Sequence, residues 1–422
     1  MARARGPCDH LGVVTEQARL QRRILRTLVA VQVVGGVGNG AGLAVGVLLL
    51  REVSGSSGWA GMSTVMLTLG AALATVPLAT LAVRAGRRPA LATGWFLGAV
   101  GAAVVVLGAD ADSLPLVLVG LFLCGVSTAS NLQSRFAAVD RAEPRHVGRS
   151  LALVTWATTV GAVLGPNLIG PGTTTARALG VPDLAGPLVF SCVAFAVAGT
   201  VVLVLLRPDP LPPARRGGID VPVPRVRAAL PHVRGETRTA VVTIALAHAV
   251  MVSVMALTPV HMQDHGAGVE VIGLTISLHI AGMYALSPVM GWLADRWGPA
   301  RTILAGQLVL VAAVVVAGTS GTSEVRITVG LVLLGLGWSA ATIAGAALLT
   351  RSTDPAVRPL VQGLGDLTMN LAGAAGGLLA GVLVAWQGFG TLNAAAGTLV
   401  VPVVLLVVAG RRAAQQVSVG TR

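Results

Sequence analysis

Twelve apolar segments, each close to the length that crosses a lipid bilayer, constrain this chain more than any other feature. A membrane-spanning helix needs about 20 predominantly apolar residues, and such runs follow one another through the 422 residues with short polar turns between them. We therefore predict an all-α integral membrane protein. The predicted spans are residues 27–50, 60–82, 89–109, 114–136, 150–170, 187–206, 239–262, 271–294, 302–318, 327–349, 359–385 and 391–410.

The distribution of basic residues predicts how these segments are oriented. All 30 basic residues are arginines, and the net charge is +13. All except Arg51, Arg177 and Arg326 lie in segments that face the same side if every apolar run crosses the membrane. Because positive residues collect on the cytoplasmic side, both termini of this multi-pass protein are predicted to be cytoplasmic. The same distribution argues against nucleic acid as a partner. The high content of Arg, Ala, Gly and Val without Lys indicates a bacterium with a GC-rich genome, so the predicted location is a bacterial plasma membrane.

The segment 282–301 joins two predicted spans through a short basic turn. Two glycines that permit close helix approach are followed by the pattern Asp-Arg-x-Gly-x-x-Arg, in which the glycine permits a tight turn. An acid here can face the positive end of another helix, and the arginines hold the turn in the cytoplasm. The residues of the pattern are Gly282, Gly291, Asp295, Arg296, Gly298 and Arg301.

This pattern resembles the signature loop of the major facilitator superfamily of secondary transporters. The resemblance extends over residues 27–410 and implies twelve transmembrane helices in two pseudo-symmetric six-helix halves, with the substrate between them. It also implies that Asp295, Arg296 and Arg301 brace a cytoplasmic gate that breaks when the halves rock. The alternative is a basic loop that only sets the topology.

The second half repeats the first at a shift of 212 residues, which places Gly70 on Gly282. The first copy of the loop departs from the pattern, because Val83 stands in the place of Asp295 and Ala79 in the place of the second glycine. A charge contact at this turn is therefore in doubt. The first-half counterpart of the gate consists of Arg84, Gly86, Arg87 and Arg88.

A segment rich in proline and arginine separates the two halves, and proline prevents it from forming a long regular helix. The predicted divisions of the chain are a cytoplasmic tail (1–26), the first half (27–206), a cytoplasmic linker (207–238), the second half (239–410) and a second cytoplasmic tail (411–422).

The fifth predicted span contains Gly161, Gly165, Pro166 and Gly170 in the arrangement Gly-x-x-x-Gly-Pro. This resembles the motif of the superfamily's drug/proton antiporters, with Ile169 in the place of the first closing glycine. The resemblance implies export of small compounds. The alternative is close helix packing through small residues, which is common in membrane proteins.

Polar side chains lie at helical spacing on several spans. A transporter would direct them into a central path, and the alternative is that they make hydrogen bonds that hold neighbouring helices together. Trp338 is an aromatic candidate for a cavity wall, where an indole can stack on a flat or cationic ligand. The cavity candidates are Gln32, Asn39, Asn131, Arg135, Trp338 and Asn370.

Asp366 is the one acid that lies inside an apolar run. A charge at membrane depth is costly unless it is paired or neutralised, so Asp366 is a candidate proton carrier. It is equally a candidate for a static ion pair with Arg135 or with an arginine of the 84–88 turn. His248 and His279 are further candidates for proton coupling, although a single helical histidine is more often simply hydrogen-bonded.

Three residues near the outer end of the seventh span, His261, Asp264 and His265, could ligate a metal. Two histidines and one acid at a helix end are a weak signal, so no metal and no cofactor are predicted. The sequence contains neither a nucleotide-binding loop nor a nucleophile-base arrangement outside the membrane. We therefore predict neither an ATP-driven pump nor an enzyme.

These features predict a secondary active transporter that carries out proton-coupled efflux of small amphipathic or hydrophobic compounds by alternating access. The alternative is a proton-coupled importer of a small nutrient such as a sugar or an organic acid. The small number of charged residues within the spans argues against an importer, because charged side chains would be needed to bind a hydroxylated or anionic solute. The expected partners are membrane lipid, a small-molecule substrate and protons, and the sequence leaves the oligomeric state open.

Overall fold

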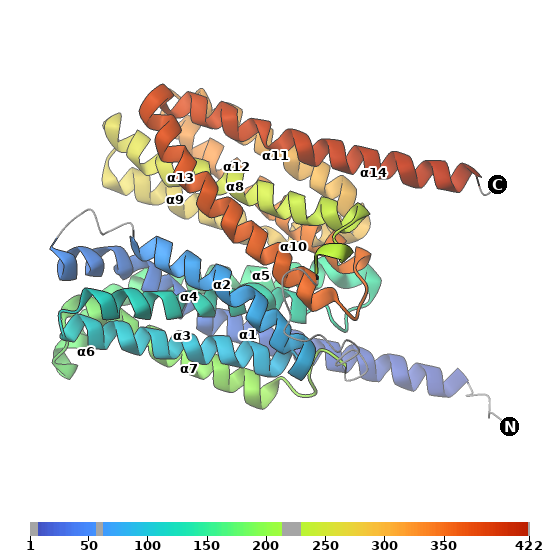
Figure 1. The fold of residues 1–422 in the computed structure, drawn as a ribbon, viewed down its shortest axis with the longest axis horizontal. Helices are drawn as coiled ribbons and strands as arrows, with labels where there is room; N and C mark the ends of the chain where they lie inside the picture. The colour runs from blue at the N-terminus through green and yellow to red at the C-terminus, as the bar shows by residue number, and fades with distance from the viewer. Residues whose placement is uncertain (1–6, 56–61, 213–228, 421–422) are drawn as a thin grey trace.

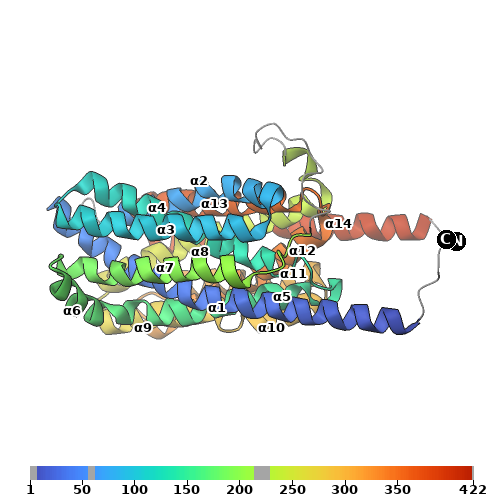
Figure 2. The same ribbon diagram turned by 90° about the horizontal axis from the view of Figure 1, so that it is seen from below.

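The computed structural model describes residues 7–55, 62–212 and 229–420, and these residues form helices without any strand. The prediction of an all-α protein is therefore confirmed for the described chain. Figure 1 shows two helical bundles side by side, which we call the first bundle (α1 to α7) and the second bundle (α8 to α14). Both termini lie at one end of the molecule, which we call the terminal end (Figures 1 and 2).

The first bundle consists of α1 (Pro7–Ser54), α2 (Met62–Ala85), α3 (Arg87–Asp110), α4 (Leu114–Ala137), α5 (Val147–Leu164), α6 (Ile169–Leu179) and α7 (Gly186–Leu205), with 3-10 turns η2 (Pro144–His146), η3 (Pro166–Leu168) and η4 (Asp183–Ala185). The second bundle consists of η7 (Leu230–His232), α8 (Gly235–Asp264), α9 (Val269–Tyr284), α10 (Ser287–Arg296), α11 (Pro299–Gly318), α12 (Glu324–Ser352), α13 (Arg358–Thr398) and α14 (Val400–Gly420). Residues 213–228 of the predicted linker lie outside the described residues.

Ten segments of the described chain are long and apolar enough to cross a membrane. The last of them, Arg358–Arg412, is 55 residues long. It holds two crossings, because the backbone leaves helical geometry at Gly388 (φ 81°, ψ 175°). The remaining crossing is α5 with α6, which the 3-10 turn at Pro166 separates. These segments together agree with the twelve spans predicted from the sequence.

The structure differs from the prediction in where some helices begin and end. The predicted span 271–294 is two helices, since α9 ends at Tyr284 and α10 begins at Ser287. Pro288 has no N–H to continue the ladder, and the Ser287 hydroxyl instead donates to the Tyr284 carbonyl over 2.6 Å. α1 and α14 extend into the predicted polar tails and project beyond the bundles (Figure 2).

Glycines allow α5 to pack directly on α1. A Cβ atom added at Gly165 would lie 2.5 Å from the Cα of Gly40, and one at Gly161 would collide with the backbone of Gly36. Close packing through small residues, the alternative interpretation of the fifth-span motif, is thus present at these two glycines. Gly170 is exposed and has no neighbouring atom within 4 Å of an added Cβ, so it takes no part in this contact.

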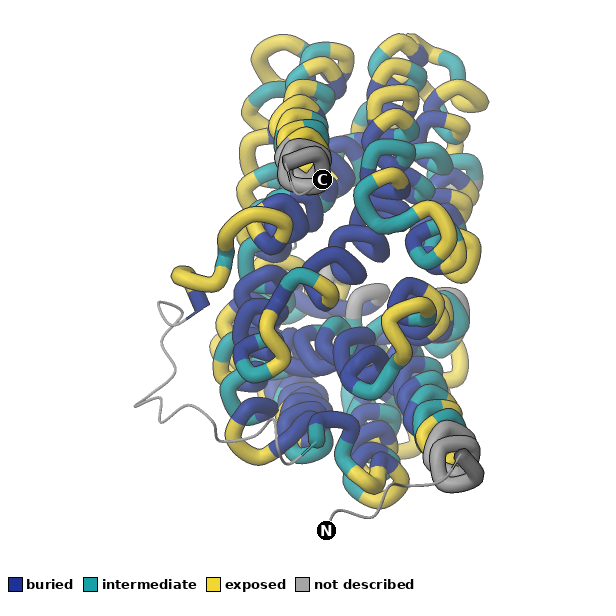
Figure 3. The backbone as a smooth tube through the Cα atoms, turned by 90° about the vertical axis from the view of Figure 1, so that its right-hand side faces the viewer, coloured by how far each residue is buried: buried dark blue, intermediate teal, exposed yellow. Residues whose placement is uncertain are grey.

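Buried residues fill the interior of each bundle, as the view from the terminal end shows (Figure 3). In the first bundle, Trp95 and Phe195 pack with their ring centroids 5.8 Å apart. Exposed leucine and valine side chains cover the outer faces of helices such as α3, α7 and α11. That distribution suits a molecule whose outer surface meets lipid chains rather than water.

Candidate functional site

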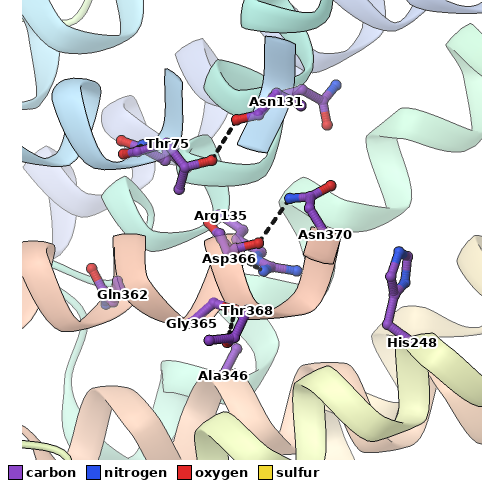
Figure 4. Close-up of polar contacts among 12 residues, drawn as sticks. Thr75, Asn131, Arg135, His248, Ala346, Gln362, Gly365, Asp366, Thr368 and Asn370 are labelled. Carbon is purple, nitrogen blue, oxygen red and sulfur yellow. Dashed lines mark hydrogen bonds and ion pairs between the residues drawn. The ribbon is translucent and has the colours of Figure 1, made fainter. Parts of the chain in front are cut away.

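An ion pair between Asp366 and Arg135 joins the two bundles. Arg135 lies in the last turn of α4 and Asp366 lies near the start of α13. Nη2 of Arg135 donates to Oδ1 of Asp366, and Figure 4 shows the two side chains together at the centre of the polar residues. Only 5% of Arg135 and 1% of Asp366 are exposed. The structure thus selects Arg135 from the arginines considered as partners.

Each member of this pair has one polar atom without a partner. Oδ2 of Asp366 and Nε of Arg135 are buried and make no hydrogen bond with any described residue. A buried polar atom that is left unpaired costs about 1–3 kcal/mol. The guanidinium stays charged under all conditions, whereas a carboxylate can take up a proton. Proton uptake by Asp366 would therefore change the pair from an ion pair to a much weaker contact.

Three aromatic rings cluster in the second bundle. Nε1 of Trp338 donates to Nδ1 of His248 over 3.1 Å, and the ring of Tyr284 meets that of Trp338 edge-on at a centroid distance of 5.8 Å. Because an indole nitrogen only donates, Nδ1 of His248 must be the acceptor and its neutral ring carries the proton on Nε2. Tyr284 is the only tyrosine in the chain, and no spacing in the sequence predicts its place in this cluster.

His279 is also hydrogen-bonded within the second bundle. Its side chain is fully buried, and Nδ1 lies 2.7 Å from the carbonyl oxygen of Leu331. A carbonyl oxygen only accepts, so Nδ1 carries a proton. Neither His279 nor His248 makes a hydrogen bond to the first bundle within the described chain, which distinguishes both of them from Asp366.

The polar candidates of the first bundle bond to one another. Nε2 of Gln32 lies 3.3 Å from Oδ1 of Asn131, and the Ser127 hydroxyl donates to Oδ1 of Asn39 over 2.9 Å. These bonds connect α1 with α4, as the helix-bonding alternative requires. Asn370 donates to the backbone oxygen of Asp366, one turn earlier in α13, over 2.8 Å.

A second contact between the bundles lies at the terminal end, around Asp295. Its carboxylate accepts from the backbone N–H of Gly148 over 2.8 Å and from that of Arg149 over 2.9 Å, at the start of α5. Nη2 of Arg351 in α12 also donates to it, over 2.9 Å. Asp295 thus lies at the positive end of a helix in the other bundle, where a carboxylate is favoured.

The other residues of the 282–301 pattern have different surroundings. Gly291 packs against the backbone of Gly148 across the bundles, where a Cβ atom would collide. Gly298 has φ 88°, and its first-bundle counterpart Gly86 has φ 106°, a region that favours glycine. A Cβ at Gly282 would lie 2.8 Å from the Val332 carbonyl oxygen of α12.

Arg296 and Arg301, which are expected to brace the cytoplasmic gate, are both exposed in this structure. The guanidinium of Arg296 lies 5.5 Å from the ring of Trp292, one turn earlier in its own helix. Arg351, which lies outside the 282–301 pattern, makes the ion pair with Asp295. Its position in the last turn of a long apolar helix is the sequence signal for this role.

The first-bundle counterpart of the loop uses a different set of contacts. Arg87 is buried, with Nε donating to Asp140 over 2.8 Å and Nη2 donating to Oε1 of Gln362 in α13 over 2.5 Å. Asp209 accepts from the backbone N–H of Arg88 over 2.9 Å and so caps α3. Val83 stands in the place of an acid at this turn, and the contact between the bundles here joins Arg87 of the first bundle to the neutral amide of Gln362 in the second. Arg84 is exposed.

Comparison with known proteins agrees with this geometry. The sequence profile of the Major Facilitator Superfamily matches residues 28–268 and 239–421. The chain belongs to this superfamily. YddS, an uncharacterized MFS-type transporter of Bacillus subtilis, is 38% identical over 401 residues, which cover 92% of each chain.

A more distant relative and a solved structure that match this chain are also transporters. The riboflavin transporter RfnT of Brucella anthropi is 29% identical over 395 residues, covering 92% of this chain and 95% of the relative. The solved structure of the human organic anion transporter MFSD10 matches with a TM-score of 0.76 at 17% identity, covering 92% of this chain and 99% of that one. The family resemblance inferred from the signature loop is confirmed, and the chain is a multi-pass membrane transporter.

In this superfamily member, Asp295→Asn is expected to lower the transport rate about tenfold without preventing insertion into the membrane. The amide loses the negative charge that faces the start of α5 and Arg351, contacts worth about 1–3 kcal/mol. The rate is measured in vesicles at matched expression. Arg296→Gln is the matched control, since Arg296 is exposed in the same turn. Equal losses in the two variants would contradict a specific role for Asp295.

Proposed function

We propose that this transporter exports a small amphipathic compound in exchange for protons by alternating access. The observation that carries the proposal is the buried ion pair of Asp366 and Arg135, which connects the two bundles. Ionisable residues inside a membrane are rare and mark paths for protons and substrates. The glycine and proline residues of α5 that resemble the antiporter motif favour export as the direction.

The arrangement of the arginines supports the cytoplasmic side as the location of the terminal end. In the described state the bundles meet at that end, through Asp295 and α5 and through Arg87 and Gln362. A proton that reaches Asp366 from outside neutralises it and releases Arg135, which favours opening towards the cytoplasm. Release of the proton there restores the ion pair and closes the terminal end while the substrate is carried outward.

The aromatic cluster supports the proposed class of substrate. Tyr284 is half-buried and offers a ring surface, the buried Trp338 packs behind it, and the half-buried His248 keeps Nε2 for a further hydrogen bond. Ring faces of this kind stack on flat compounds and attract cations. A planar compound with one apolar side and one polar side suits them better than a sugar does.

A second candidate function is proton-coupled import of a small nutrient. The observation that favours it is the relative named as a riboflavin transporter, which aligns over 92% of this chain. Uptake would use the same residues with the proton and the nutrient moving in the same direction. The two functions therefore differ in their direction of coupling.

The experiment that tests the proposal follows a fluorescent amphipathic dye in inside-out vesicles and riboflavin in right-side-out vesicles. Export predicts that the dye accumulates inside the inside-out vesicles when their interior is acidic, and that a protonophore abolishes accumulation. Vesicles without the protein are the control. The import alternative makes a different prediction for right-side-out vesicles. When their interior is alkaline and the medium is acidic, riboflavin should accumulate inside them. Movement of neither compound under either gradient would contradict the proposed substrate class.

A further inference from the structure

Four arginines line a groove where α1 enters the apolar part of the molecule. Arg19, Arg22, Arg23 and Arg26 are all exposed, and their spacing places them on one face of α1. Together with Thr27 and Leu205 they line a groove of about 470 Å³. Residues 27–50, which follow directly, contain no charged side chain.

The charge of this groove is not compensated within the described structure. None of the four arginines forms an ion pair with a described acidic residue. Like charges three or four residues apart on a helix repel one another. An anion bound between them would remove that repulsion, so the groove favours a negatively charged ligand.

The depth of the groove indicates where such an anion comes from. Arg26 lies at the border of the uncharged run, and a helical rise of about 1.5 Å per residue places Arg19 about 10 Å further out. The polar headgroup region of one leaflet is about 5–8 Å thick. The guanidinium groups of Arg22, Arg23 and Arg26 therefore lie at the level of the lipid phosphates, and Arg19 follows just beyond them.

A second, apolar groove lies along α7, one helical turn from the Leu205 that borders the basic groove. It measures about 350 Å³ and is lined by Cys192, Val193, Ala196, Val197, Thr200 and Val201. Steps of four residues lead from Val193 through Val197 and Val201 to Leu205, which borders the basic groove. At the helical rise, this face is about 18 Å long, close to the half-thickness of about 15 Å of the hydrocarbon core.

The two grooves belong to helices that are packed together. The Ser191 hydroxyl of α7 donates to the Gly38 carbonyl of α1 over 2.8 Å, and α1 lies beside α7 and continues past its end in Figure 2. We propose that one anionic phospholipid binds here, with its phosphate among the four arginines and an acyl chain along α7. This site is independent of the proposed direction of transport and of the proton carrier.

Free phosphate shares the chemistry of the headgroup, but it would use the arginines alone. A zwitterionic lipid would use the apolar groove without the net charge. If the arginines only set the topology of the chain, no lipid would be preferred. The proposal therefore requires both grooves to contribute to one binding event.

The test is native mass spectrometry of the purified full-length protein with phosphatidylglycerol, phosphatidylcholine or inorganic phosphate. The unaltered chain is expected to retain phosphatidylglycerol in preference to phosphatidylcholine. Arg22→Gln with Arg26→Gln is expected to weaken phosphatidylglycerol binding about 25-fold, from roughly a fivefold loss for each arginine. Arg411→Gln with Arg412→Gln, exposed arginines near the other terminus, is the matched control and is expected to change nothing.

A variant of the apolar groove separates lipid from free phosphate. Val197→Trp fills the groove on α7, where Val197 is 42% exposed, and leaves all four arginines in place. We expect it to weaken phosphatidylglycerol binding while phosphate binding stays the same. Unchanged phosphatidylglycerol binding in Val197→Trp or in the Arg22 and Arg26 variant would overturn the proposal. Equal retention of the two lipids by the unaltered chain would do the same.

Discussion

Asp366→Asn is expected to abolish transport driven by a proton gradient while the protein remains in the membrane. Asparagine keeps the shape of the side chain but cannot take up and release a proton at neutral pH. The ion pair with Arg135 is lost at the same time. Dye movement in vesicles under an imposed proton gradient is the measurement, and we expect it to fall to the background of vesicles that lack the protein.

Removing one member of a buried pair leaves the other charge uncompensated, which costs about 3–5 kcal/mol. A poorly folded Asp366→Asn would therefore be uninformative by itself. Asp366→Asn combined with Arg135→Gln removes both charges, and this variant is expected to recover expression without recovering gradient-driven transport. Thr368→Val is the matched control, because the Thr368 hydroxyl bonds only within its own helix, to the Gly365 carbonyl over 2.9 Å.

Gradient-driven transport that survives in the double variant would contradict the role proposed for Asp366. Proton coupling would then move to His248 or His279. These two histidines make their hydrogen bonds within the second bundle, to Trp338 and to the Leu331 carbonyl. Loss of gradient-driven transport on replacing His248 or His279 would then identify the histidine that couples transport to protons.

Gly291→Val is expected to prevent closure of the terminal end and to reduce transport roughly 10- to 100-fold. A Cβ at Gly291 would lie 2.5 Å from the Cβ of Ala152 and would collide with the Gly148 carbonyl oxygen of α5. Overpacking of this kind costs about 1–3 kcal/mol, and the collision exists only while the bundles are closed at this end. The variant should therefore favour the state that is open there.

Spin labels attached at Arg145 and Arg301 report on this change, because both positions are exposed and belong to different bundles. In a cysteine-free background the distance between the labels is expected to increase in Gly291→Val. Gly170→Val is the matched control, since no atom lies within 4 Å of a Cβ added there. An unaltered distance with normal transport would show that α10 and α5 tolerate the larger residue and that Gly291 does not limit closure.

Some features of this protein follow from the sequence alone. The twelve apolar runs, the superfamily and the turn glycines Gly86 and Gly298 could be predicted because each depends on residues that are close together in the chain. Hydropathy over about 20 residues determines whether a segment crosses a membrane, and no distant contact can change that result. The family pattern is likewise contained within a single loop.

Other features depend on how the two bundles pack against each other. The partner of Asp366 is 231 residues away in the chain, and Arg87 reaches Gln362 over 275 residues. Several arginines had the right charge and the right depth, so only the packing of α4 against α13 could select Arg135. In the same way, Arg351 rather than Arg296 pairs with Asp295, because a contact between helices depends on which faces meet and sequence spacing does not determine that.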